Sequence, residues 1–248
     1  MQIIISPAKK MRMDTDSFAW RDLPAFLHRT EALFSRLKEL SYEELKSLWK
    51  CNDKIAAQNA ERINTLDLHT SLTPAVMAYE GIQYQYMAPG VFDEDALEYV
   101  QDHLRILSGF YGLLRPFDGV IPYRLEMQAK LSVDGYKDLY AYWGDTLAKA
   151  LWAESDVVVN LASKEYSQCI SKYVPEGKRF LTCTFGQRKG DKIIEKGTMC
   201  KMARGEMVRY LAETQADDPE QLKAFDRMGY HFSSVDSTQT NYVFIKEE

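Results

Sequence analysis

The sequence predicts a single α+β or mixed α/β domain in which helices surround a central mixed sheet. Two apolar runs, Gln2–Ser6 and Asp156–Leu161, have the near-continuous hydrophobicity of strands that are buried on both faces. Elsewhere, apolar residues recur at helical spacing. No internal repeat and no long low-complexity linker divides the 248 residues, so we expect one domain over residues 1–248.

The segment after the first strand is predicted to be mainly helical. Residues 11–22 are polar and mixed, which predicts an irregular linker. Apolar residues then follow helical spacing through Pro24–Leu40. Ser41 and Glu44 form a Ser-x-x-Glu capping box, so a second helix is expected over Tyr42–Trp49.

A tight turn joins this second helix to a third, which is expected to run to about Ile63. Two short helices joined in this way form either an ordinary αα-hairpin of the core or a helix–hairpin–helix, and both interpretations remain open. The second motif grips the DNA backbone through main-chain amides of its turn, usually with glycines that let phosphate approach. This turn has no glycine; its residues are Lys50, Cys51, Asn52 and Asp53.

The middle of the chain is predicted to contain both strands and helices. Ala75–Tyr79 is apolar and follows a Thr-Pro pair, and it is predicted to be a strand of the central sheet. Ile82–Ala88 alternates aromatic and polar residues, which leaves its state ambiguous. Asp93 is placed to cap a helix that runs to about His103, and Leu104–Leu107 is predicted to be the next strand.

The C-terminal half alternates in the same way. A helix is expected over Asp138–Ala153, before the strand at Asp156–Leu161. Two runs separated by a basic loop predict a β-hairpin. The hairpin strands and the later elements are Arg179–Phe185, Lys192–Glu195, a helix over Met199–Ala212, a helix from Asp218 to about Phe225, and terminal strands at Tyr230–Phe232 and Tyr242–Lys246.

One stretch, Leu104–Met127, combines fixed charges with residues that interrupt regular structure. Arg105, Arg115, Arg124 and Glu126 lie here among glycines, prolines and aromatic residues. A segment that only filled a core would need neither the charges nor the interruptions. Because functional side chains concentrate on loops held by a rigid scaffold, this stretch is expected to carry function.

Candidate site residues follow the ends of the two buried strands. Ser6 and Lys9 come directly after the first strand, and Asn160 and Tyr166 lie where the second passes into a helix. The carboxyl ends of strands in α/β sheets are common ligand sites, and a helix N-terminus there favours an anion. A solvated lysine pair and plain helix capping by Ser163 are the alternative interpretations.

Two further cations lie on the helix predicted over Met199–Ala212. Lys201 and Arg204 are three residues apart and therefore share one face. Glu126 is expected to pair with Arg115, with Arg124 or with this helix, because an isolated carboxylate would repel an anionic ligand. The candidate residues for binding DNA or another anion are Ser6, Lys9, Arg115, Arg124, Glu126, Asn160, Tyr166, Lys201 and Arg204.

Four separate segments resemble, in order, the YaaA family of bacterial peroxide-stress proteins. They are ISPAK at Ile5–Lys9, Leu104–Met127, VVNLASKEY at Val158–Tyr166 and KMARG at Lys201–Gly205. The resemblance covers nearly the whole chain and implies a DNA-binding protein that limits oxidative damage and unincorporated iron. It also implies a helix–hairpin–helix, which we place at the turn after Trp49. The chain departs from the family pattern at Lys10, usually threonine, and at Met202, usually basic.

Three functions remain open from the sequence. The first is a peroxide-stress protein that binds DNA with little sequence preference through a local basic cleft, because the net charge of −5 argues against a generally basic coat. The second is an enzyme acting on a nucleic-acid or phosphorylated substrate in the same cleft, with Glu126 or Glu165 as acid or base. The third is direct metal handling, which is the weakest because no cluster of His, Asp and Glu has ligand spacing.

Cofactors and membranes have no support in the sequence. The 4 cysteines are scattered without a C-x-x-C pair, so neither a zinc site nor a disulfide framework is predicted. No phosphate-loop or dinucleotide motif is present, and no cofactor is expected. The first apolar run, three residues long, is too short for a signal-peptide core or a membrane span. We therefore expect a cytoplasmic protein without a membrane partner; a monomer is favoured, although the sequence does not give the oligomeric state.

Overall fold

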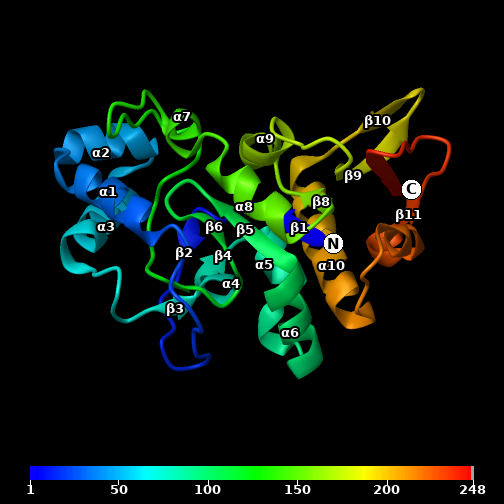
Figure 1. Cartoon of the computed structure of the whole chain (residues 1–248), viewed down its shortest axis with the longest axis horizontal. Coiled ribbons are helices and arrows are strands. Elements are labelled where there is room, and N and C mark those ends of the chain that lie inside the picture. Colours follow the sequence, from blue (N-terminus) through cyan, green and yellow to red (C-terminus); the bar gives the residue numbers. More distant parts are fainter. Residues whose placement is uncertain (247–248) are drawn as a thin grey trace.

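A mixed central sheet lies between layers of helices (Figure 1). The structure is a computed structural model and describes residues 1–246. Within them an eight-stranded sheet runs in the order β11-β12-β9-β8-β1-β5-β6, with β10 paired to β9, which confirms the predicted fold class. Its strands are β1 (Gln2–Ile5), β5 (Leu104–Ser108), β6 (Gly112–Leu114), β8 (Val157–Leu161), β9 (Arg179–Lys189), β10 (Lys192–Ile194), β11 (Tyr230–Phe232) and β12 (Asn241–Lys246).

The inner strands of this sheet are parallel, and their order reverses once. β1 pairs in parallel with β5 on one side and with β8 on the other, and β9 and β12 continue in parallel beyond β8. Numbered along the chain, the parallel strands lie in the spatial order 2-1-3-4-5, so the order switches between β1 and β8. Ligands of open α/β sheets bind beyond the carboxyl ends of the strands at such a switch point.

Helices cover both faces of the sheet. Figure 1 shows α5 (Ile82–Met87), α6 (Glu94–His103) and α10 (Gly197–Thr214) together on one side, and α8 (Thr146–Glu154) and α9 (Lys164–Ser171) on the other. Three N-terminal helices form a lobe at the end nearest β6. They are α1 (Leu27–Lys38), α2 (Tyr42–Trp49) and α3 (Asp53–Thr65).

β1 lies at the centre of the hydrophobic core. Ile3, Ile4 and Ile5 are fully buried, as are Val158 and Val159 of the neighbouring β8. Both faces of these strands are buried because helices pack on each of them, which is why no polar residue alternates with the apolar ones. The two runs that predicted the fold are therefore adjacent central strands.

The N-terminal helices begin where the capping residues predicted. The Ser41 hydroxyl accepts a hydrogen bond from the Glu44 N–H at 3.4 Å, and the Glu44 carboxylate accepts one from the Ser41 N–H at 2.8 Å. The Asn52 side chain caps α3 by accepting from the Ile55 N–H at 3.0 Å. Local sequence therefore determines where α2 and α3 begin.

The prediction that Ala75–Tyr79 is a strand of the central sheet is wrong. Residues Ala75–Ala78 form the short helix α4, and all four are buried. A short apolar run cannot be assigned to a strand or to a buried helix by periodicity alone, and three of its residues are not β-branched. Tyr79–Glu80 then forms β4, which pairs with β2 (Lys10–Met11) in a separate two-stranded sheet.

Other elements differ in extent. The helix predicted over Asp138–Ala153 is two helices, α7 (Leu139–Trp143) and α8, because Gly144 adopts a φ of +51° between them. The segment from Asp218 forms a 3₁₀ helix at Pro219–Ala224. The ambiguous segment after Gly81 is helical and forms α5. Two short strands, β3 (Thr73–Pro74) and β7 (Gly119–Val120), pair with each other away from the main sheet.

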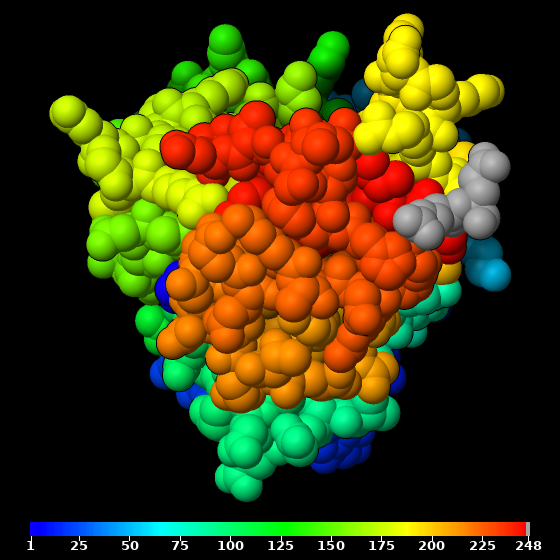
Figure 2. Space-filling view, turned by 90° about the vertical axis from the view of Figure 1, so that its right-hand side faces the viewer, coloured from blue at the N-terminus to red at the C-terminus, as the bar shows by residue number. Residues whose placement is uncertain are grey.

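The predicted β-hairpin is present and projects from the molecule. β9 continues beyond the sheet and turns back into β10, with Lys189 opposite Lys192. Figure 2 shows the yellow end of this hairpin standing out above the C-terminal segments. The hairpin leads directly into α10, which places the first residues of that helix at its base.

Candidate functional site

A cleft of about 400 Å³ opens beyond the carboxyl ends of β1 and β8, where the strand order switches. Its walls come from the loop after β1, the start of α5, the segment after β7, the loop before α9, and α10. Of the nine candidate residues, all but Arg115 and Asn160 line it. The charged and hydroxyl-bearing lining residues are Ser6, Lys9, Lys10, Glu80, Tyr84, Tyr123, Arg124, Glu126, Ser163, Glu165, Tyr166, Lys201 and Arg204.

Ser6 joins the two loops at the switch point. Its hydroxyl accepts a hydrogen bond from the Ser163 N–H at 2.8 Å and donates to the Ser163 hydroxyl at 3.2 Å. The Tyr84 hydroxyl donates to the Ser6 carbonyl at 3.0 Å. Ser6 therefore holds the cleft together, because its hydroxyl is used between the loops.

Glu126 bridges two cations of the cleft. Its carboxylate lies 2.8 Å from the Lys9 ammonium and 3.3 Å from the Arg124 guanidinium. The predicted pairing with Arg124 is confirmed, whereas Lys9 was not among the expected partners. Arg124 also donates to the Trp49 carbonyl at 3.4 Å, which links the cleft to the end of α2.

Gly109 explains why Glu126 lies where it does. A Cβ at this glycine would lie 2.6 Å from the Leu125 carbonyl oxygen and 2.9 Å from the Glu126 carbonyl carbon. Both are backbone atoms, which cannot move aside as a flexible side chain would. The glycine therefore lets the chain that carries Arg124 and Glu126 pass directly over the end of β5.

Gly205 has the same effect on α10. A Cβ there would lie 2.1 Å from the Gln83 carbonyl oxygen, so α10 crosses α5 with no room for a side chain. This close crossing brings Lys201 and Arg204 to the cleft. Arg204 is mostly buried and has one ionic neighbour, Glu195, at 3.8 Å. Lys201 is exposed and forms no ion pair with any residue in 1–246.

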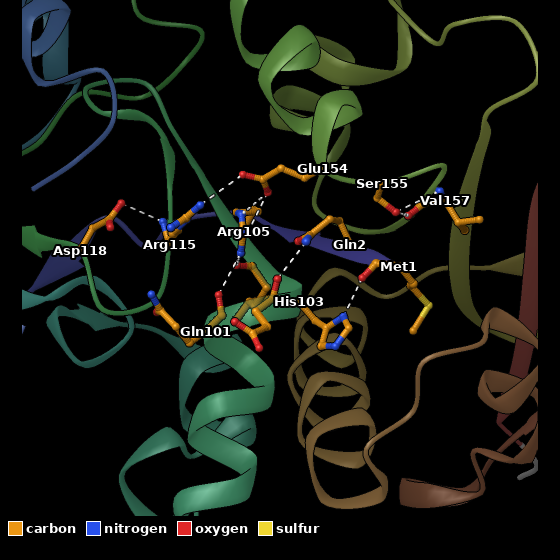
Figure 3. A network of polar contacts seen from close by, with 12 residues as sticks. Met1, Gln2, Gln101, His103, Arg105, Arg115, Asp118, Glu154, Ser155 and Val157 are labelled. Carbon is orange, nitrogen blue, oxygen red and sulfur yellow. Dashed lines mark hydrogen bonds and ion pairs between the residues drawn. The ribbon is translucent and has the colours of Figure 1, made fainter. Parts of the chain in front are cut away.

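Arg115 does not join the cleft, so the prediction that it would do so is wrong. β6 runs antiparallel to β5, and the residue that follows β6 therefore lies at the opposite edge of the sheet from the carboxyl ends of β1 and β8. There Arg115 pairs with Glu154 at 3.5 Å, beside Arg105, which reaches the same carboxylate at 2.8 Å (Figure 3). The Asp118 carboxylate accepts from the Arg115 N–H at 2.9 Å.

Asn160 lies behind the cleft and not in its lining. Its side chain is buried, donates to the Thr182 hydroxyl at 3.3 Å and accepts from the Ala162 N–H at 2.9 Å. These bonds turn the chain at the end of β8 toward Ser163. Asn160 therefore shapes the loop, and the prediction that it binds a ligand directly is not supported by its position.

Glu165 and Tyr166 enter the cleft from the first turn of α9. Burial raises the pKa of Glu165, the neighbouring Glu126 adds to this, and the Gln128 N–H and Lys9 oppose it. Burial also raises the pKa of Tyr166 far above its usual value. A carboxyl group with a raised pKa beside a second, ion-paired carboxylate is an arrangement that proteins use in acid–base sites.

Some residues that line the cleft were not among the candidates predicted from the sequence. Lys10 was set aside because it departs from the family pattern, yet it lies on the cleft wall and pairs with Glu80 at 2.8 Å. Tyr123 is 2.6 Å from the Ser108 hydroxyl and 2.8 Å from the Tyr79 hydroxyl, and burial raises its pKa to about 12. The cluster forms only when β4, β5 and the segment after β7 meet.

The α2–α3 turn is an αα-hairpin whose connection is held by its own side chains. Lys50 adopts the left-handed conformation with φ of +46° and is exposed. Asp53 pairs with Lys46 at 2.5 Å, and its carbonyl accepts from the Tyr42 hydroxyl at 3.2 Å. Cys51 is half-buried. A role of this hairpin in binding DNA stays a prediction.

A larger depression of about 970 Å³ lies at the amino-terminal ends of β9 and β12, away from their carboxyl ends. It is wide and open, and Ser and Thr side chains form much of its lining. Each of its three cations has a carboxylate within 4 Å, because Glu220 lies 2.5 Å from Lys223 and 3.9 Å from Arg179, and Asp156 lies 3.3 Å from Lys178. The cleft is the better candidate, because it lies at the strand switch point and its Lys201 has no ion-pair partner in residues 1–246.

Comparison with known proteins assigns the family. A family model described as "Peroxide stress protein YaaA" matches residues 1–235. The chain belongs to the YaaA family. Membership confirms the resemblance seen in the four sequence segments and gives the chain a general role in the peroxide stress response.

Relatives within the family match over essentially their whole length. A "UPF0246 protein" of Lachnoclostridium phytofermentans is 54% identical over 248 residues, which are 100% of this chain and 97% of the relative. A "UPF0246 protein" of Agathobacter rectalis is 53% identical, covering 98% of both chains. One of Pediococcus pentosaceus is 51% identical, covering 100% of this chain and 99% of the relative.

Two further features concern membranes and metal ions. Within residues 1–246, no helix combines the length and the apolar character needed to cross a bilayer. In the same part of the chain, no three His, Cys, Asp or Glu side chains gather into a group that could hold a metal ion.

Proposed function

We propose that this protein binds DNA through the cleft, with little sequence preference, as its part in the peroxide stress response. The observation that carries the proposal is that Lys9, Arg124, Lys201 and Arg204 line one cleft although they come from three distant segments. Cations gathered at one place attract phosphates even when the whole protein is negatively charged.

The local charge of the cleft supports this proposal. The chain has a net charge of −5, yet these four cations and Lys10 face only three carboxylates in the lining, from Glu80, Glu126 and Glu165. Glu80 and Glu126 each lie within 3 Å of a lysine ammonium. The cations of α10 are the least compensated, so they are the ones best placed to meet a phosphate.

The packing of α10 supports weak sequence preference. The helix packs closely on α5 and also contacts α6 and β9, so it cannot enter a DNA groove as an exposed recognition helix does. Its cations are therefore presented to the sugar–phosphate backbone, where contacts position a protein without reading sequence.

The α2–α3 hairpin is the second contact that we propose. The Trp49 carbonyl at the end of α2 accepts from Arg124 at 3.4 Å, so the hairpin adjoins the cleft. Exposed Lys50 follows it in the turn, where its charge and nearby main-chain amides can meet a phosphate. A backbone strand that crosses the cleft would then reach the turn, which is how a helix–hairpin–helix would contribute.

Three of the four cysteines are poorly placed to react with peroxide. Cys169, Cys183 and Cys200 are buried, and burial raises the pKa of Cys169 and of Cys183 to about 12. The thiolate is the form that peroxide oxidises, and redox-sensing cysteines are exposed and have lowered pKa values. Protection through DNA binding agrees better with these environments.

An enzyme with a small anionic substrate is the second candidate. The observation that favours it is the pair of carboxyl groups in the cleft, since Glu126 is held by two cations while burial raises the pKa of Glu165. Unequal carboxyl groups can serve as the base and the acid of one reaction. Turnover of phosphorylated substrates in the absence of DNA would support this candidate.

A duplex-binding measurement tests the proposal. Fluorescence anisotropy with labelled duplexes of unrelated sequence should give similar affinities that fall steeply as salt increases. The double variant Lys201→Ala/Arg204→Ala should lose most of the affinity. Arg115→Ala removes an arginine of the Leu104–Met127 segment that lies at the opposite edge of the sheet, and it should bind as the wild type does. A salt-insensitive affinity, or full binding by the double variant, would move the assignment to the enzyme.

A further inference from the structure

We propose that the cleft holds a single nucleotide, with its phosphate at Lys201 and Arg204 and a base bearing N–H donors at Glu165. The inference rests on the proposed function, because the nucleotide would be one that leaves the stack of the bound DNA. A free nucleotide has the same chemistry, and the experiment below separates the two sources.

The size of the cleft excludes a duplex and admits one nucleotide. Its volume of about 400 Å³ falls within the range of small-molecule pockets and is far too small for a double helix. A duplex can therefore lie across the opening of the cleft but cannot enter it. The interior can therefore hold one nucleotide. An unpaired or mismatched nucleotide requires the least free energy to leave the base stack.

Glu165 is the lining carboxylate that has no ion-pair partner within residues 1–246. Glu80 lies 2.8 Å from Lys10, and Glu126 lies 2.8 Å from Lys9. Within residues 1–246, Glu165 forms no ion pair, and the Gln128 N–H donates to one of its oxygens at 3.3 Å. A half-buried carboxyl group on a cleft wall with remaining acceptor capacity requires a hydrogen-bond partner from the ligand.

On α10, the groups without close partners are positively charged. Lys201 has no ion-pair partner in the described residues, and the carboxylate nearest to Arg204 is at 3.8 Å. The Nε–H of Arg204 is buried without a hydrogen-bond partner in that same part of the chain. The cleft therefore requires an anion at α10 and an N–H donor at Glu165. A nucleotide carries both, because its phosphate is anionic and its base has amino groups.

Tyrosine rings provide the remaining surface. The hydroxyl of Tyr84 donates to the Ser6 carbonyl, and the hydroxyl of Tyr123 is bound between Ser108 and Tyr79. Tyr84 is only 4% exposed and the Tyr123 ring stacks on Phe110, so these rings form an apolar wall of the cleft. A base can pack on the exposed part of this wall, because base–aromatic contact tolerates any base.

The position of Glu165 predicts which bases the cleft prefers. Adenine, cytosine and guanine each carry an exocyclic amino group, whereas thymine carries none and its single N3–H lies between two carbonyl oxygens that would repel the carboxylate. Isothermal titration with dAMP and dTMP should therefore give tighter binding of dAMP. Glu165→Ala should weaken dAMP binding about tenfold, which is the loss of one hydrogen bond to a charged group, and should leave dTMP binding unchanged.

A second measurement uses DNA itself. A duplex with 2-aminopurine opposite an abasic site should fluoresce more strongly on binding, because the base leaves the stack. Glu165→Ala should abolish this increase at protein concentrations that saturate the duplex, as anisotropy of the same samples shows. Asp145→Asn, which removes a surface carboxylate paired with Lys149, is the matched control and should behave as wild type in both assays.

The outcomes separate the two proposals. If the unmodified protein binds a paired duplex but causes no fluorescence change and does not bind dAMP, the nucleotide site is overturned and DNA binding stands. Binding of dAMP without any affinity for DNA would overturn the proposed function and support the site for a free nucleotide. Equal binding of dAMP and dTMP by wild type and Glu165→Ala would overturn the role of Glu165.

Discussion

The Lys9 ammonium lies 2.8 Å from the Glu126 carboxylate, although the two residues are more than a hundred positions apart. This ion pair joins the loop after β1 to the segment that follows β7. Arg124 reaches the same carboxylate, so one acid fixes the positions of two cations in the cleft. The pair therefore sets the distribution of positive charge that a phosphate would meet.

Replacement of Glu126 by glutamine should destabilise the protein and weaken DNA binding. Arg124 is largely buried, and loss of the carboxylate leaves its guanidinium without an ionic partner. Because Lys9 remains exposed to water, we expect a loss of about 1–2 kcal/mol in the free energy of unfolding, measured by urea denaturation.

Glu80→Gln is the matched control for this change. Its partner Lys10 is highly exposed, so the ion pair is screened by water and the stability should fall by less than about 0.5 kcal/mol. An unchanged urea midpoint together with unchanged DNA affinity for Glu126→Gln would remove Glu126 from the site.

Gly205→Ala should disturb the crossing of α10 on α5. The new Cβ would lie 2.1 Å from the Gln83 carbonyl oxygen, and a backbone atom cannot give way without moving the helix. The expected loss is about 1–3 kcal/mol, together with weaker DNA binding because Lys201 and Arg204 move. Gly197→Ala, in the first turn of the same helix with nothing within 4 Å, should leave both unchanged. Equal thermal midpoints for the two variants would contradict the packing argument.

Asp118 should make stability depend on pH at the edge of the sheet opposite the cleft. Burial raises its pKa from 3.8 to about 7, against the Arg115 N–H and guanidinium that lower it. Between these values the native state binds more protons than the unfolded chain, so the free energy of unfolding falls as pH rises, by up to about 1.4 kcal/mol per pH unit. Asp118→Asn should remove this decline, as urea denaturation at pH 5 and pH 7 would show. Parallel pH profiles for both proteins would contradict it.

The parts of the fold that depend on nearby residues could be predicted from the sequence. The run of isoleucines in β1 and the capping box at Ser41 act within a few residues, and both formed as expected. Ala75–Ala78 could not be assigned, because a short buried apolar run fits a helix as well as a strand and only its tertiary surroundings decide.

Whether a residue lines the cleft depends on the direction of the strand before it, which the sequence pattern did not predict. Arg115 and Arg124 lie in the same segment, but the antiparallel course of β6 places Arg115 at the far edge. Burial raises the pKa of Glu165 and the Gln128 N–H lowers it, and Gln128 comes from a segment distant in the sequence. The motif thus indicated the residue types of the site, while long-range pairing decided which of them meet.

The salt dependence of DNA binding should report how many cations meet phosphates. If all four of Lys9, Arg124, Lys201 and Arg204 do so, the slope of log K against log salt should be about −3 to −4. Lys201→Ala and Arg204→Ala should each lower affinity for every sequence and make the slope shallower by about 1, whereas Arg115→Ala should leave it unchanged. Anisotropy titrations at several salt concentrations provide the measurement, and an unaltered slope in the Lys201 variant would exclude its contact with phosphate.

The turn between α2 and α3 can be tested without disturbing its fold. Lys50 has a φ of +46°, a conformation that glycine adopts without strain, so Lys50→Gly should keep or slightly raise the thermal midpoint. If the turn meets a phosphate, as a helix–hairpin–helix would, the variant should lose affinity for all duplexes and its salt slope should become shallower by about 1. The control is Lys149→Ala, which removes another exposed lysine outside the cleft. Alanine is used there because Lys149 lies inside α8, where glycine would destabilise the helix. Wild-type affinity and slope in Lys50→Gly would identify the turn as an ordinary αα-hairpin that only supports Arg124 through Trp49.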